Sequence, residues 1–178
     1  MTHYQTMDAN LPITAASQAS FPWLSLIVLF PTVGAFLMPF IPSKENYSSG
    51  APRNLAIGIL LVDFAVMIGV FTGIFDPKEA GLQLVERINW IPFIGLEWSL
   101  GADGISVPLV LLSGLITLLA TVASWKIEGK TRLYFALLLV QASAQALVFL
   151  SQDFLLFFLA WELELVPVYL LISIWGGN

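Results

Sequence analysis

The sequence predicts an all-α polytopic membrane protein with about five transmembrane helices. Of its 178 residues, 58% are hydrophobic and only 11% are charged, whereas soluble domains carry about 25% charged residues. Five apolar segments are each long enough to cross about 30 Å of hydrocarbon at a rise of 1.5 Å per helical residue. Together, the composition and the segment lengths place the chain in the membrane class.

The five segments predict one helix each, in chain order. The expected spans are 22–41, 54–75, 105–125, 133–150 and 154–175. Only three residues separate the last two spans, so these two helices are expected to form an antiparallel hairpin. The whole stretch 22–178 is interpreted as one transmembrane domain. It ends abruptly at Asn178, directly after the fifth span, and is therefore interpreted as a fragment or partial chain.

Two stretches outside the spans have distinct compositions. Residues 1–21 contain no Lys or Arg, whereas a secretory signal needs a basic leading region. They are predicted to form an exposed amino-terminal tail. The connection 76–104 mixes apolar and charged residues and contains Trp90 and Trp98. Because tryptophan favours the membrane–water interface, we expect irregular or short β structure there, lying over the helix ends.

The distribution of basic residues predicts the orientation. On one side of the membrane, the loops contain five basic residues: Lys44, Arg53, Lys126, Lys130 and Arg132. On the other side they contain two: Lys78 and Arg87. The more basic side is expected to face the cytoplasm. The amino-terminus is then outside the cell or in a lumen.

The composition also excludes several kinds of site. The chain has no cysteine and a single histidine, His3. Iron–sulfur ligation, disulfides, a His/Cys zinc site and a bis-histidine haem are therefore excluded for this chain. No basic cluster is present to neutralise phosphates, so a nucleic-acid partner is not expected. The sequence predicts no cofactor or metal in this chain, and any redox centres would lie in partner proteins.

The fifth span contains the residues that most strongly indicate a function. Glu162 and Glu164 lie in its middle, and a carboxylate near a bilayer midplane is by default a functional candidate. Pro167 follows Glu162 by five residues and cannot donate a hydrogen bond to the carbonyl of Leu163. A helix break beside a charged residue in a lipid-spanning segment indicates an ion or proton path.

The two glutamates are not equivalent. At 100° per residue they point about 200° apart on the helix. Glu162 shares its face with the hydroxyls of Tyr169 and Ser173, which suits a hydrogen-bonded proton relay. Glu162 is therefore predicted to carry protons, with the alternative that it only satisfies a polar group on a neighbouring helix. Glu164 shares its side with apolar residues and is the weaker candidate for translocation.

Three further polar features lie in the spans. Gln141 and Gln145 share a face of the fourth span, where they serve either helix packing or a proton path, and both possibilities stay open. A stripe of Ser and Thr in the third span, including Thr117, indicates close helix packing. Asp63 has no polar companion on its own face of the second span. A structural hydrogen bond and a transport role both remain possible for it.

Two motifs resemble a known family. They are GADGISVPL, at residues 101–109, and WELELVPVYLL, at residues 161–171. Both resemble chain 4 of the NAD(P)H-quinone oxidoreductases of cyanobacteria and chloroplasts, and the similarity covers at least residues 100–177. The relatives of this family in bacteria and mitochondria are antiporter-like subunits of respiratory complex I.

The resemblance implies a fold and a function. It implies the amino-terminal part of a fourteen-helix antiporter-like subunit, in which an essential glutamate lies five residues before a proline; here that is Glu162 before Pro167. The family glutamate pairs with a lysine on a later helix. The resemblance further implies an oxidoreductase complex that passes electrons from NAD(P)H or reduced ferredoxin to plastoquinone and translocates protons across the thylakoid membrane. The expected partners are the other membrane-arm subunits and the lipid bilayer.

Two alternatives to this function stay open. A subunit of a multisubunit sodium/proton antiporter shares the fold and the glutamate–proline motif. A non-transporting assembly subunit or paralogous fragment would contribute only helix packing.

Overall fold

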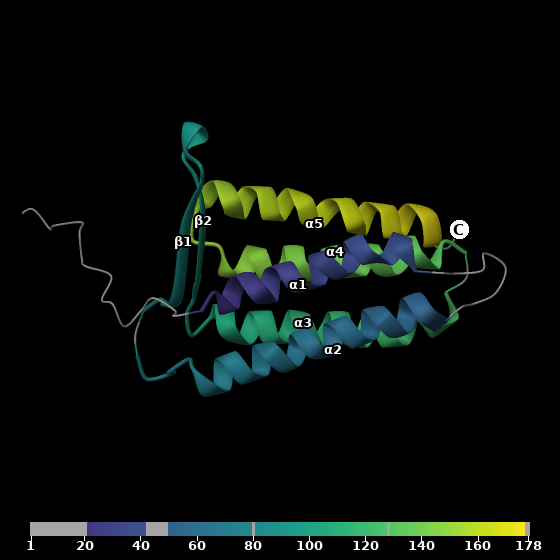
Figure 1. Ribbon diagram of the computed structural model, residues 1–178, viewed down its shortest axis with the longest axis horizontal. Coiled ribbons are helices and arrows are strands. Elements are labelled where there is room, and N and C mark those ends of the chain that lie inside the picture. The colour runs from purple at the N-terminus through teal and green to yellow at the C-terminus, as the bar shows by residue number, and fades with distance from the viewer. Residues whose placement is uncertain (1–20, 42–49, 80, 128, 177–178) are drawn as a thin grey trace, which may run out of the picture.

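A computed structural model describes residues 21–41, 50–79, 81–127 and 129–176. Five helices lie side by side, and a β-hairpin crosses one end of the bundle (Figure 1). The helices are α1 (Trp23–Leu37), α2 (Gly50–Gly73), α3 (Ser106–Ala123), α4 (Thr131–Leu150) and α5 (Phe154–Trp175). The strands are β1 (Gln83–Ile91) and β2 (Leu96–Ala102). Three short 3-10 helices are η2 (Met38–Phe40), η3 (Pro92–Ile94) and η4 (Ser124–Lys126).

The fold class is confirmed, since the described residues form five helices long and apolar enough to cross a membrane. The fifth helix has the predicted bounds, 154–175. The second begins at Gly50 rather than at residue 54, because its first turn is polar and hydropathy does not detect it. The predicted tail lies outside the described residues, apart from Phe21.

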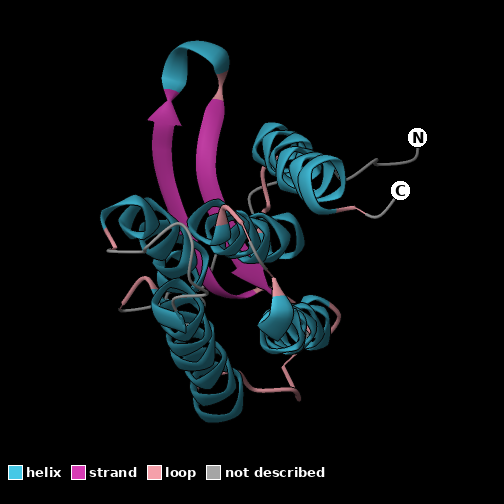
Figure 2. Cartoon of the chain, turned by 90° about the vertical axis from the view of Figure 1, so that its right-hand side faces the viewer, coloured by secondary structure: helices cyan, strands magenta, loops and turns pink. Residues whose placement is uncertain are grey.

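The connection between α2 and α3, where irregular or short β structure was expected, forms a two-stranded antiparallel hairpin. Ile88 lies opposite Trp98, and two irregularities in the register interrupt the pairing. Gly95, with a φ of 69°, closes the tip in a left-handed conformation that glycine adopts without strain. The hairpin lies across the helix ends, as predicted, and extends beyond the bundle (Figure 2).

The turn between α4 and α5 docks against the hairpin. The backbone N–H of Gln152 donates to the carbonyl of Ser99 at 2.8 Å, and Ser151 forms a bridge with Leu100. The side-chain amide of Gln152 donates to the carbonyl of Gly101 at 3.3 Å. The hairpin therefore holds the start of α5 in a defined position.

Helix α4 is the centre of the bundle and α5 lies at its edge. In α4, 61% of the apolar stretch is buried, against 17% in α5. Leu139 and Leu150 of α4 are fully buried and belong to two separate apolar clusters. The cluster that contains Leu150 lies at the hairpin end of the bundle. Most of α5 is therefore uncovered by the described residues.

The basic residues sort to the two ends of the bundle. Arg53 packs over the Trp125 ring, with its guanidinium carbon 3.5 Å from the ring centroid. Lys130 precedes α4 at the same end, whereas Lys78 follows α2 and Arg87 belongs to β1. Figure 1 shows the end of α2 and the hairpin together at the opposite end of the bundle. Arg53 and Arg132 belong to the first turns of α2 and α4 rather than to loops, and Lys44 lies outside the described residues.

Asp103 caps the start of α3. Its carboxylate accepts from the backbone N–H groups of Ser106 at 2.7 Å and Ile105 at 3.0 Å. The Ser106 hydroxyl in turn accepts from the backbone N–H of Asp103 at 2.8 Å. The pKa of Asp103 is below its usual value of 3.8, mainly because its carboxylate accepts a hydrogen bond from the Ser106 N–H.

Asp103→Ala is expected to destabilise the chain by about 1 kcal/mol at neutral pH, because the start of α3 loses its cap. Since folding lowers the pKa of Asp103 below 3.8, the ionised cap stabilises the folded chain above that pH. The difference in stability between wild type and Asp103→Ala should shrink as the pH falls through the lowered pKa of Asp103. Thermal unfolding in detergent, followed by circular dichroism across this pH range, measures it. Asp103→Asn should lose less, since Asn also caps helices, and equal losses for Ala and Asn would contradict the capping role.

Candidate functional site

Helix α5 positions the two glutamates. It begins at the cap residue Asp153, whose carboxylate accepts from the backbone N–H of Leu156 at 2.8 Å. It then continues to Trp175, so Pro167 does not end the helix, and the predicted break is limited to the backbone hydrogen bond that Pro167 cannot make to Leu163. Pro167 still has no N–H to offer the carbonyl of Leu163.

Glu164 faces α4, where two glutamines bind it. The side-chain amides of Gln141 and Gln145 donate to the same carboxylate oxygen, Oε1, at 3.0 Å and 3.3 Å. The two glutamines lie one helical turn apart on α4, so both reach the same carboxylate. The structure therefore brings together three of the predicted site residues.

A third helix joins this network. The hydroxyl of Thr117, in α3, donates to Oε1 of Gln145 at 3.2 Å. Hydrogen bonds therefore run from α3 through α4 to α5 and end at Glu164. These companions of Glu164 come from α3 and α4, so the apolar residues on its own face of α5 did not reveal them.

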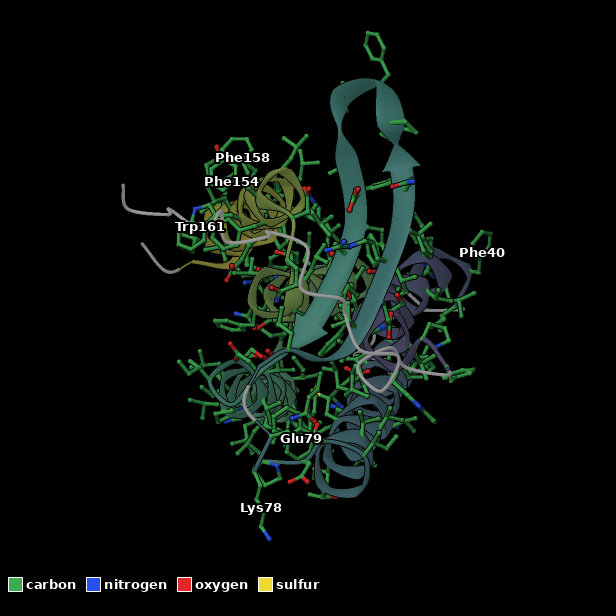
Figure 3. All side chains as sticks on the ribbon, turned by 90° about the vertical axis from the view of Figure 1, so that its left-hand side faces the viewer. Phe40, Lys78, Glu79, Phe154, Phe158 and Trp161 are labelled. Carbon is green, nitrogen blue, oxygen red and sulfur yellow. The ribbon has the colours of Figure 1, made fainter. Side chains whose placement is uncertain are left out.

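Glu162 points away from the bundle. Its side chain is exposed, and it forms no hydrogen bond or ion pair within the described residues. Tyr169, on the same face, is 71% exposed. Figure 3 shows Phe154, Phe158 and Trp161 directed outward from α5, away from the other helices. Glu162 and Tyr169 therefore share a face of α5 that no described residue covers, and Glu164 lies apart from them.

Asp63 is buried in α2, with 3% of its surface exposed. Within the described part of the chain, no hydrogen bond to its carboxyl group is formed. Its own face of α2 carries the apolar residues Leu60, Met67 and Val70, which are buried as well. The structure supplies no role for Asp63, and both of its predicted roles stay open.

The middle of the spans carries no cation. Arg53, Lys126 and Arg132 fall within the helical segments, but all three lie in terminal turns. Among the described residues, no group of three or more His, Cys, Asp or Glu side chains lies close enough to hold a metal ion. The absence of a cofactor from this chain stays a prediction.

A further carboxylate, which the sequence analysis did not single out, fastens the hairpin to α1. Glu86 of β1 is buried and accepts from the backbone N–H groups of Leu24 at 2.6 Å and Ser25 at 2.9 Å. It also accepts from the Ser25 hydroxyl at 2.5 Å, and that hydroxyl accepts from the indole N–H of Trp98 at 2.8 Å. The one signal of this contact in the sequence is Pro22. It precedes α1 and has no side chain that could cap the helix, so the cap must come from elsewhere in the chain.

Comparison with known proteins identifies the relatives of this chain. No protein-family model matches it. It is 52% identical over 160 residues to NAD(P)H-quinone oxidoreductase chain 4 2 of Microcystis aeruginosa, and 55% identical over 157 residues to chain 4 1 of Synechococcus elongatus. The chain is a relative of NAD(P)H-quinone oxidoreductase chain 4. The resemblance predicted from the two motifs is thereby confirmed.

The matches cover most of this chain but a minor part of its chain 4 relatives. They span 90% of this chain and 28% of the Microcystis protein, and 88% of this chain and 29% of the Synechococcus protein. The chain therefore spans about 30% of the length of these relatives, as it also does for chain 4 1 of Thermosynechococcus vestitus.

Solved structures show the same fold. A chain of respiratory complex I from Thermus thermophilus matches with a TM-score of 0.70 at 24% identity, over 87% of this chain and 30% of that chain. A chain of the membrane-bound sulfane sulfur reductase, an archaeal respiratory membrane complex, matches with a TM-score of 0.68 at 20% identity. The five helices and the hairpin therefore follow the fold of membrane subunits in multisubunit respiratory complexes.

Proposed function

We propose that this chain is a proton-translocating membrane subunit of a complex I-like oxidoreductase that passes electrons from NAD(P)H or ferredoxin to plastoquinone. The observation that carries the proposal is the 50–55% identity to chain 4 proteins over about nine tenths of the chain. The glutamate in mid-helix supports it independently, since intramembrane carboxylates mark ion and proton paths. Glu162 loads and releases the proton.

The position of Glu162 supports this role, because it lies in mid-helix on a face of α5 that no described residue covers. Burial of a carboxyl group in low dielectric disfavours its charged form, and a cation nearby favours it. The middle of the described spans offers no cation, and the uncovered side of α5 leaves room for a partner of Glu162 outside the described residues. We propose a lysine on a further helix, as the family resemblance implies, and Tyr169 as a hydroxyl along the same path.

The redox chemistry belongs to partner subunits. The sequence has no cysteine and one histidine, and therefore lacks the ligands for iron–sulfur clusters and haem. NAD(P)H or ferredoxin and plastoquinone would be used by other subunits, to which this chain is coupled mechanically or electrostatically. The partners are the other membrane-arm subunits and the lipid bilayer.

We further propose that the chain lies in a thylakoid membrane with its amino-terminus on the lumenal side. The more basic end of the bundle then faces the cytoplasm or stroma. Because the sequence has no cysteine, single substitutions report topology cleanly. A maleimide that cannot cross the membrane, added from the stromal side, should label Lys130→Cys and leave Lys78→Cys unlabelled. Labelling in the opposite pattern would reverse the orientation.

The proposed function is tested on the assembled complex in its native membrane. Proton movement should require an electron donor and a quinone and should be independent of sodium. Removal of this chain should lower the number of protons moved per electron. A proton flux that needs sodium but no electron donor would identify a sodium/proton antiporter instead. Unchanged proton movement without the chain would favour a non-transporting role.

A further inference from the structure

We propose that Glu164 is a positioning residue, which locks the middle of α5 against α4 so that Glu162 is held facing away from the bundle. The inference rests on the proposed function, because Glu162 is the group that Glu164 positions. It assigns the two glutamates different tasks, although they lie two residues apart. Glu162 carries the proton and Glu164 does not.

The first support is the geometry of the clamp. Two amides, from Gln141 and Gln145, donate to one oxygen of Glu164 at 3.0 Å and 3.3 Å. Because the donors are separated by one turn of α4, they hold the carboxylate from above and below along the helix axis. Sliding of α5 along α4 would lengthen one of the two bonds, and rotation of α5 would break both. The position of Glu164 therefore fixes the direction in which Glu162 points.

The second support is that the donors are themselves oriented. The hydroxyl of Thr117 donates to Oε1 of Gln145, so the amide nitrogen of Gln145 is the atom that faces Glu164. The carbonyl oxygen of Gln141 is buried without a partner among the described residues, while its nitrogen faces the carboxylate. Turning either amide over would set oxygen against oxygen. Both amides are therefore oriented to donate to an acceptor, and that acceptor is the carboxylate of Glu164.

The third support is the proline. Leu163, between the two glutamates, has a carbonyl that Pro167 cannot serve, so α5 lacks a backbone hydrogen bond at this level. A helix is least constrained where its hydrogen-bond ladder is interrupted. Side-chain bonds to α4 at Glu164 restore a constraint at the turn that carries Glu162, and the helix stays continuous there.

The chemistry of the network also argues against proton conduction through it. Glutamine side chains donate through an amide N–H and accept through a carbonyl. An amide nitrogen holds its hydrogens far more tightly than a carboxyl group does, and its lone pair, delocalised into the carbonyl, does not accept a proton. The two amides that bind Oε1 of Glu164 therefore hold the carboxylate in place and do not themselves take up or deliver its proton. Glu162 has no such enclosure.

Two substitutions at Glu164 separate positioning from proton carriage. Glu164→Gln keeps an oxygen that can accept from both amides and cannot ionise. Glu164→Leu has a similar size and removes the acceptor. In the assembled complex, we expect Glu164→Gln to retain at least half of the protons moved per electron, and Glu164→Leu to lose most of them. The infrared carboxyl band of Glu162, assigned by its absence in Glu162→Gln, should shift in Glu164→Leu and keep its position in Glu164→Gln.

The outcomes are distinguishable from failure of the proposed function. Normal pumping by Glu162→Gln, measured in parallel, would overturn the proposed function. Loss of pumping in Glu164→Gln as complete as in Glu162→Gln would make Glu164 a proton carrier and overturn the positioning role. Wild-type pumping and an unshifted band in Glu164→Leu would overturn it as well. If Glu164→Leu fails to assemble, Gln141→Met and Gln145→Met each remove one donor; partial loss with a shifted band is expected, and wild-type behaviour of both overturns the proposal.

Discussion

Glu162→Gln is expected to abolish proton translocation while the complex still assembles. Gln keeps the size and hydrogen-bonding capacity of the side chain but cannot take up or release a proton. Loss of a group that transfers protons lowers rates by on the order of 10²-fold or more. Because the Glu162 side chain makes no hydrogen bond within the described residues, the substitution removes none from this bundle. Acidification of the lumen, driven by an electron donor, measures the effect, and native electrophoresis checks assembly.

A matched control is Glu97→Gln, which makes the same chemical change outside the membrane. Glu97 lies on β2 with its side chain 41% exposed, in a surface ion pair with Arg87. This variant should pump as wild type does. If Glu162→Gln pumps as well as Glu97→Gln, Glu162 is structural, and the packing or assembly function takes the place of proton translocation.

Glu86→Ala is expected to release the hairpin from α1 and to destabilise the chain by about 2–3 kcal/mol, because buried N–H donors lose a charged acceptor. The substitution leaves the backbone N–H groups of Leu24 and Ser25 without the carboxylate. It also removes a negative charge from the positive end of the α1 dipole. Thermal unfolding in detergent, followed by tryptophan fluorescence, measures this loss, and Trp98 reports directly on the hairpin because it binds Ser25.

Arg87→Ala is the control for this prediction. Arg87 is the next residue on β1, with its side chain 54% exposed, and its surface ion pair with Glu97 spans 3.6 Å. Exposed ion pairs contribute about 0–1 kcal/mol. Equal destabilisation by Glu86→Ala and Arg87→Ala would show that the buried carboxylate does not fasten the hairpin.

The spans could be predicted from the sequence because a helix that crosses lipid needs apolar side chains along its whole length. A long apolar run meets this need within one stretch of sequence, so α5 was predicted with its observed bounds. The start of α2 could not be placed in the same way, since the turn beginning at Gly50 is polar and extends beyond the apolar run. The hairpin was expected only as short or irregular β structure, because its pairing depends on contacts between two strands.

Contacts between elements limited the prediction of the site. Periodicity on α5 separated the faces of Glu162 and Glu164 correctly. It could not show that Gln141 and Gln145 meet Glu164, since that depends on the rotation of α4 against α5. It also could not place Glu86 at α1, because 62 residues separate Glu86 from Leu24. α5 runs through Pro167 to Trp175, although the proline leaves one backbone hydrogen bond of the helix unmade.

The protonation of Glu162 during turnover is the most direct test of the central claim. Infrared difference spectra of the assembled complex, with and without an electron donor, should contain a carboxyl band that changes between states and is missing in Glu162→Gln. That result would show Glu162 taking up and releasing a proton as the complex works. Spectra in which Glu162 stays ionised in every state would contradict its role as a proton carrier.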